Sequence, residues 1–186
     1  MEKSKAINNL MDEHAAILFT LKVLIKLERL GENHTAIERS DIEKLVDFLK
    51  VFADQCHHGK EEQYLFETGI IASEELSTLN AILADHKQAR HYILQMEEAL
   101  SYATEERIIL PLAFRQAAKN YIALLHEHII VENEQFFPIL TRSLSIDQDN
   151  ELFQKFAQFE AEVIGEGVHE YYHQLLDYFD NKYIEA

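Results

Sequence analysis

Hydrophobic residues recur at intervals of three and four along most of the chain, the spacing typical of α-helices with one buried face. The first such stretch covers residues 7–30 and ends at Gly31-Glu32-Asn33. The second opens at Ser40-Asp41-Ile42-Glu43, which has the form of a capping box, and continues to Phe66. The pattern therefore predicts two long helices in the amino-terminal part of the chain.

Two further stretches with the same spacing follow. One extends from about Ser77 to Leu100, and the other covers roughly residues 104–140, where Pro138 is expected to end or bend the helix. Because the chain contains only five Gly and two Pro, it is rich in helix-forming residues and leaves little material for a sheet. We expect an all-α fold built on four long helices.

Two shorter helical patterns lie beyond the polar stretch of residues 143–150. They cover residues 152–164 and 168–183 and are separated by Gly165-Glu166-Gly167. We expect two additional C-terminal helices that pack on the first four. Since no Pro-rich or Ser-rich linker separates them, residues 1–186 should form a single domain, with a core of about residues 5–142 and an extension of residues 151–186.

The charge of the chain narrows its possible partners. With 33 acidic and 17 basic residues, the formal net charge is −16, and such a field repels nucleic acid and anionic lipid. We expect no nucleic acid and no membrane partner. The amino terminus lacks the apolar stretch of a signal peptide, which favours a cytoplasmic location. The single cysteine, Cys56, is expected to be a small core residue.

The chain contains ten histidines, and helical geometry separates those expected to point into the core from those expected to be exposed. At about 100° of turn per residue, His14 lies on the apolar stripe of its helix. His86 and His128 do the same on the third and fourth helices, so all three should point into the core. The histidines that fall off these stripes or lie in a turn are expected to be exposed: His34, His91, His126, His169 and His173.

On the second helix, two neighbouring pairs compete for the inward position. His57 with Glu61 and His58 with Glu62 both have the four-residue spacing that places two side chains on one face. Relative to the stripe that contains Cys56, His57 lies at the edge and His58 points roughly 160° away. We therefore expect His57 and Glu61 to face the core.

An internal repeat supports this register. Residues 57–66 and 128–137 share the pattern His-x-x-x-Glu followed by an apolar pair that ends in Phe. In the first and third helices, likewise, an acidic residue directly precedes the histidine, as Glu13-His14 and Asp85-His86. The four helices therefore resemble two similar hairpins related by a pseudo-twofold axis.

The inward residues have the chemistry of a metal site. Buried imidazoles without partners are costly, and Glu61 and Glu132 each place an oxygen donor beside a nitrogen donor. Four histidines and two carboxylates exceed the needs of one tetrahedral zinc, and their donor types suit iron, with manganese and zinc as competitors. The pattern also differs from the Glu-x-x-His motif of ferritin-like sites. The candidate metal residues are His14, His57, Glu61, His86, His128 and Glu132.

These motifs closely resemble the hemerythrin-like, or HHE cation-binding, family over about residues 5–142. The resemblance rests on Glu13-His14, residues 57–66, Asp85-His86 and residues 128–138. It implies an antiparallel up-down four-helix bundle that holds two non-haem iron ions, bridged by an oxo or hydroxo group. Its histidines would be terminal ligands and its glutamates bridges.

The resemblance also implies which histidines share an iron ion. It pairs His14 with His128 at one ion and His57 with His86 at the other. Oxygen-carrying hemerythrins have a fifth histidine one helical turn beyond the third, and this chain has Arg90 there. Six protein ligands would leave the site open to a small molecule.

We expect a binding or sensing module whose di-iron centre takes up dioxygen, nitric oxide or peroxide in oxygen handling or stress response. The alternatives are a di-iron oxidoreductase, a protein that donates iron to damaged clusters under oxidative or nitrosative stress, and iron storage or sensing through metal-dependent folding. The sequence indicates neither a redox partner nor an oligomeric state.

Overall fold

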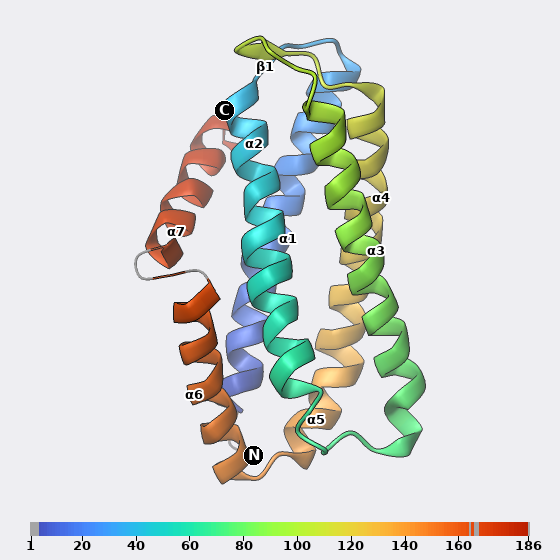
Figure 1. The fold of residues 1–186 in the computed structure, drawn as a ribbon, viewed down its shortest axis with the longest axis vertical. Helices are drawn as coiled ribbons and strands as arrows, with labels where there is room; N and C mark the ends of the chain where they lie inside the picture. Colours follow the sequence, from blue (N-terminus) through green and yellow to red (C-terminus); the bar gives the residue numbers. More distant parts are fainter. Residues whose placement is uncertain (1–3, 164, 166–167, 186) are drawn as a thin grey trace.

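The computed structural model describes residues 4–163, 165 and 168–185, without the side chain of His169, and this part of the chain is mostly helical (Figure 1). The predicted all-α class is confirmed. Two-residue strands, β1 (Ile37–Glu38) and β2 (Arg107–Ile108), pair in antiparallel register as a small addition. The first and third helices are α1 (Lys5–Glu32) and α3 (Leu76–Leu100), the latter preceded by a 3-10 turn, η3 (Ser73–Glu75).

The second and fourth helices contain π-helical stretches. The second helix, residues 39–65, comprises α2 (Arg39–Phe48), η1 (Leu49–His58) and η2 (Glu61–Leu65). The fourth, residues 112–143, comprises α4 (Leu112–Val131), η4 (Glu132–Phe136) and α5 (Phe137–Ser143). Because i→i+5 hydrogen bonds widen each turn, a residue advances by less than the 100° of an α-helix. Side-chain directions worked out from α-helical phase therefore drift in these stretches.

Two predicted helix starts were wrong, and β pairing explains both. The proposed capping box does not form, because the second helix begins at Arg39 after Glu38, without a side-chain cap. The fourth helix begins at Leu112 rather than near residue 104, with Pro111 at its N-cap. The intervening backbone is used instead by the β1·β2 pair, extended by a hydrogen bond from Arg39 N to Glu106 O.

The carboxy-terminal extension packs along α1 and the second helix, as predicted (Figure 1). It consists of α6 (Ile146–Val163), α7 (Val168–Phe179) and η5 (Asp180–Ile184), so its first helix starts earlier than expected. Residues 164, 166 and 167, which we expected at the junction, lie outside the described residues. Asp149 ties α6 to the start of α1, since its carboxylate accepts hydrogen bonds from Ser4 and from the backbone of Lys5 and Ala6.

The hydrophobic core is divided into two clusters by a buried polar layer. One cluster includes Leu10, Leu65 and Phe136, and the other includes Ile17 and Leu125. The polar layer lies between them along every one of the four long helices and consists of His14, His57, His58, Glu61, His86, His128 and Glu132. All seven side chains are buried.

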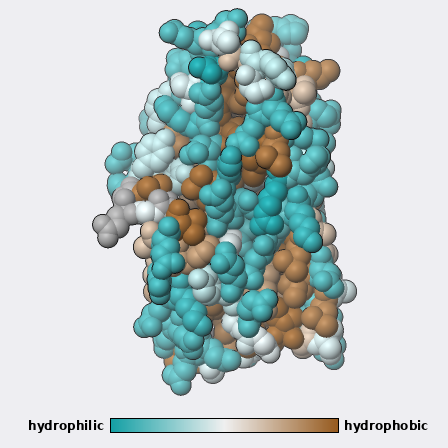
Figure 2. Space-filling model, in the orientation of Figure 1, coloured by the Kyte–Doolittle hydropathy of each residue, from teal (hydrophilic) through white to brown (hydrophobic). Residues whose placement is uncertain are grey.

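The surface in the view of Figure 2 is mostly hydrophilic, with hydrophobic residues in separate patches. Among the described helices, none combines the length and the apolar character that crossing a membrane requires.

At the other end of the extension, the buried carboxylate of Asp41 anchors the end of α7 and η5 to the second helix. It accepts hydrogen bonds from Tyr183 Oη at 2.6 Å, Lys182 Nζ at 2.7 Å and Tyr178 Oη at 3.1 Å. Burial raises the pKa of Asp41, but these hydrogen bonds outweigh burial and hold the pKa below its usual value. Asp41, proposed above as part of a cap, therefore serves a tertiary contact.

We predict that Tyr183→Phe lowers the free energy of unfolding by about 2 kcal/mol, because it removes a hydrogen bond to a buried carboxylate. Thermal or urea unfolding measures the change. Tyr102→Phe is the control, since Tyr102 is 90% exposed and should unfold like the unmodified chain. Equal stability of the two variants would show that the Asp41 contact contributes nothing.

Candidate metal centre

The polar layer contains two overlapping groups of possible metal ligands. In each group the nitrogen or carboxylate oxygen atoms lie within 4.8 Å of one another, and every member is buried. Glu61 belongs to both groups. The first group is completed by His14, His57 and Glu132, and the second by His58, His86 and His128.

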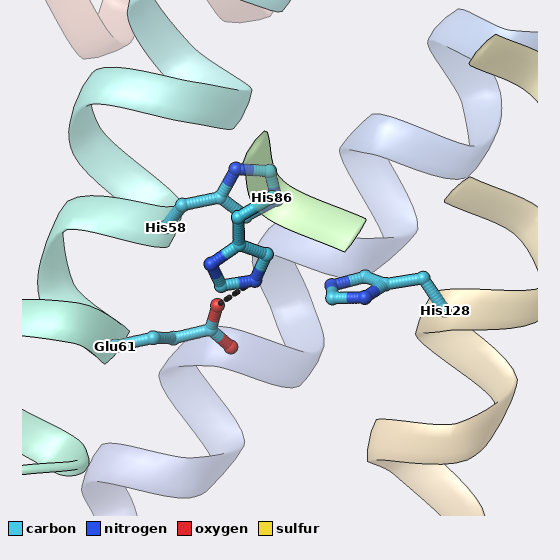
Figure 3. Close-up of side chains that lie close together, drawn as sticks. All are labelled: His58, Glu61, His86 and His128. Carbon is cyan, nitrogen blue, oxygen red and sulfur yellow. Dashed lines mark ion pairs between the residues drawn. The ribbon is translucent and has the colours of Figure 1, made fainter. Parts of the chain in front are cut away.

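Figure 3 shows the second group: His58 and Glu61 project from the second helix, His86 from α3 and His128 from α4, all toward one another. Glu61 Oε2 lies 3.4 Å from His86 Nε2, and Glu61 Oε1 lies 3.6 Å from His57 Nε2. Glu132 Oε2 is 3.2 Å from both His14 Nε2 and His128 Nε2. Each of the two glutamates therefore contacts two histidines, one from each group.

The outer ring nitrogen, Nδ1, of every histidine in the layer faces a protein oxygen. Carboxylate and amide oxygens only accept, so in the four hydrogen-bonded pairs Nδ1 donates the proton and Nε2 is left free to coordinate. These pairs are His57 with Glu13 at 2.9 Å, His14 with Asn133 at 2.9 Å, His86 with Glu62 at 2.8 Å and His58 with Asp54 at 3.2 Å. His128 Nδ1 lies 3.5 Å from an oxygen of Asp85 and forms no hydrogen bond with it.

These outer partners follow the pseudo-twofold relation predicted from the repeat. Glu13 and Asp85, which precede the histidines of α1 and α3, each face a histidine of the next helix. Glu62 and Asn133, which follow Glu61 and Glu132, face the histidines of α3 and α1. The acidic residue before each histidine thus orients a histidine on another helix rather than its own neighbour.

The inner atoms of the layer are suited to metal ions. Within the described residues, Nε2 of all five histidines and both oxygens of Glu61 and Glu132 are buried without a hydrogen-bond partner. Leaving one such group unsatisfied costs about 1–3 kcal/mol. Metal ions would satisfy these atoms together, and a set of imidazoles and carboxylates suits iron or a similar transition metal.

The electrostatics of the layer point the same way. Burial, with the charge of Glu132, raises the pKa of Glu61 well above its usual value. Burial lowers the pKa of His57 to about 4. His128 is the exception: burial lowers its pKa, but the Glu132 charge and the contact with Asp85 outweigh burial and raise this pKa to about 9. Its Nε2 would therefore have to lose a proton when a metal ion binds. Two buried carboxylates repel each other here, and positive ions between them would relieve that repulsion.

The structure brings all six predicted metal residues into one layer, and their binding of metal stays a prediction. It adds His58, which the α-helical phase directed away from the core. His58 ends η1, and the wider π-helical turn brings it beside His57. The available signal was the run His57-His58 followed by Glu61-Glu62, which gives two adjacent pairs at the same spacing.

Which histidines share an ion stays a prediction, but the groups of possible ligands combine the histidines differently from the predicted pairs, His14 with His128 and His57 with His86. The structure groups His14 with His57, whose ring centroids are 4.6 Å apart, and His86 with His128, at 4.9 Å. Each helical hairpin thus brings together its own two histidines, because consecutive helices face each other across the layer. The histidines found exposed as predicted are His34, His91, His126 and His173; the side chain of His169 lies outside the described residues.

Behind His57, a buried lysine extends the outer contacts to the carboxy-terminal extension. Lys60 is fully buried, and its Nζ donates to Glu13 and, at 2.6 Å, to Glu160 of α6. The nearby Cys56 is buried as predicted, and burial raises the pKa of its thiol to about 12. The position of His57 is therefore supported from α6 through Lys60 and Glu13.

Comparison with protein families identifies the class of this centre. The family model described as the hemerythrin HHE cation binding domain matches residues 5–140. The chain belongs to this family, as the resemblance of its motifs indicated. Comparisons with curated proteins and with solved structures returned no match. The matched region contains the entire polar layer and ends before α6.

We predict that His58→Ala weakens binding of one of two divalent ions at least about tenfold, the loss typical of disturbing even an outer partner of a ligand. His126→Ala should bind metal like the unmodified chain, because His126 is exposed on the same helix as His128. Metal content after dialysis against a weak chelator measures both. Equal retention in the two variants would exclude His58 from the ligand set.

We also predict that ferrous iron stabilises the fold. At a free ion concentration 1,000 times the dissociation constant, one site should raise the free energy of unfolding by about 4 kcal/mol. Anaerobic thermal unfolding measures the shift, and Ca²⁺, which prefers oxygen ligands alone, serves as the control ion. An unchanged unfolding midpoint with ferrous iron would contradict a metal role for the polar layer.

Proposed function

We propose that this chain binds two non-haem iron ions in the polar layer and takes up a small oxidant, dioxygen, nitric oxide or peroxide, at that centre. The observation that carries the proposal is that two groups of possible ligands share Glu61. In the described part of the chain, the histidine Nε2 atoms and the glutamate oxygens of these groups have no hydrogen-bond partner. We further propose that the four long helices form the antiparallel up-down bundle of the family, with the extension in the same domain.

The contacts suggest a role for each ligand. Glu61 and Glu132 would bridge the two ions, because each contacts a histidine of both groups. The terminal ligands would be His14 and His57 on one side and His58, His86 and His128 on the other. Iron at this centre would supply redox chemistry and a coordination position for the small ligand.

The two sides of the centre differ by one histidine, and this difference locates the proposed ligand position. In the second copy of the repeat, buried Ile129 stands where His58 stands in the first. The pseudo-twofold relation therefore assigns an apolar residue to the side of His14 and His57. We place the oxidant on this side, where the protein offers fewer ligands.

Absorption spectroscopy of the iron-loaded, oxidised chain tests the proposal, with azide as the probe. We expect azide to change the absorption bands of the unmodified chain, and Ile129→His to weaken azide binding about tenfold or more, since a third imidazole would compete for the position. Ile130→His, on the next and only half-buried position, is the matched control and should bind azide normally.

Two results would count against the proposal. Bands that do not respond to azide would contradict small-ligand binding at the centre, and equal azide affinity in both variants would contradict its placement beside His14 and His57. Following peroxide over time in the same samples separates uptake from catalysis, because sustained consumption would favour the alternative of an oxidoreductase.

A further inference from the structure

Arg90 joins two of the outer hydrogen bonds of the polar layer. It lies on α3 one turn after His86, and its Nε donates to Asp54 Oδ1 at 2.7 Å. Its Nη2 donates to Glu62 Oε1, also at 2.7 Å. These are the same two oxygen atoms that accept from His58 Nδ1 and His86 Nδ1. One guanidinium therefore fixes both acceptors.

We propose that Arg90 is a positioning residue for the metal centre: through Asp54 and Glu62 it orients the imidazoles of His58 and His86 so that both Nε2 atoms point at one ion. This inference rests on the proposed metal-binding function. It also explains how three imidazoles can meet on this side of the centre although position 90 is not a histidine. The third imidazole on this side comes from the π-helical stretch, and Arg90 holds the ring in place.

The geometry requires an arginine rather than any positive charge. A planar guanidinium presents donors in fixed directions and reaches two separate carboxylates at once, whereas an ammonium group is a single point charge. The rings of His58 and His86 are stacked with centroids 3.9 Å apart, so we expect the movement of one ring to affect the other. At the matching position on α1, four residues after His14, the chain has Leu18, so this arrangement belongs to the three-histidine side.

A purely mechanical role for Arg90, as an ion pair between helices, has a direct control. Lys50 and Glu97 likewise join the second helix to α3, at 2.7 Å, and the side chain of Lys50 is 43% exposed against 36% for Arg90. Within the described part of the chain, the hydrogen bond and ion pair of Lys50 and Glu97 are with each other and do not involve a histidine of the layer. Removing Lys50 therefore removes a comparable ion pair without touching an outer partner.

The experiment is a titration with Co²⁺, monitored by the visible absorption of the bound ion, on the unmodified chain and on Arg90→Met, Arg90→Lys and Lys50→Met. For Arg90→Met we expect one of two cobalt ions to bind about 10–100-fold more weakly, the usual effect of losing an outer partner, with an altered absorption band. Arg90→Lys should recover only part of this loss. Lys50→Met should match the unmodified chain.

Several results would overturn the inference. Binding by Arg90→Met that matches the unmodified chain in affinity and spectrum would do so, and so would an equal loss in Lys50→Met. Full recovery in Arg90→Lys would contradict the need for two directed donors. If circular dichroism shows that Arg90→Met does not fold, the comparison of Arg90→Lys with Lys50→Met still tests the positioning role. Equal cobalt affinity in these two variants would overturn it.

A second measurement separates this inference from the proposed function. If the unmodified chain takes up no cobalt, metal binding itself fails. Nitrogen-15 spectra of the imidazoles in the metal-free chain then test the positioning alone. We expect Nδ1-protonated rings for His58 and His86 in the unmodified chain and a changed tautomer balance in Arg90→Met. Identical spectra would overturn the positioning role.

Discussion

The fold depends on a layer of polar side chains buried in the middle of its hydrophobic core. Leu10 and Ile17 on α1 belong to different apolar clusters, and His14 stands between them. The other three long helices are divided in the same way. Burying polar atoms without partners destabilises a fold, so the layer is unfavourable for the protein alone. Metal ions would turn the same atoms into cross-links between the helices, coupling stability to metal binding.

The outer contacts of the histidines make this layer a single unit. Glu13 on α1 faces His57 on the second helix, and from there the contacts continue from helix to helix until they return to α1: Glu62 to His86, Asp85 to His128, and Asn133 to His14. Each long helix thus supplies a side chain that contacts a histidine of the next helix, and its own histidine is contacted by the helix before it. Lys60 donates to Glu13 and Arg90 donates to Glu62, so two of these contacts have a further support. On the proposed function, the ligand geometry would be determined before any ion binds.

Periodicity predicted the helical class, the extension and six residues of the polar layer, because apolar stripes determine which face of an α-helix is buried. His58 was missed because it lies in a π-helical stretch, where side chains no longer follow a 100° step. The start of the fourth helix was missed because Arg107 and Ile108 pair with a distant strand, a long-range contact that local patterns do not reveal. The grouping of histidines likewise depends on how the hairpins face each other.

Anomalous diffraction at the iron edge from crystals of the iron-loaded chain would test the central claim most directly. We expect two peaks, about 3.5–4 Å apart as in other two-metal sites. One should lie beside His14 and His57 and the other beside His58, His86 and His128, with Glu61 between them. A single peak, or peaks away from the polar layer, would contradict a two-metal centre built from these side chains.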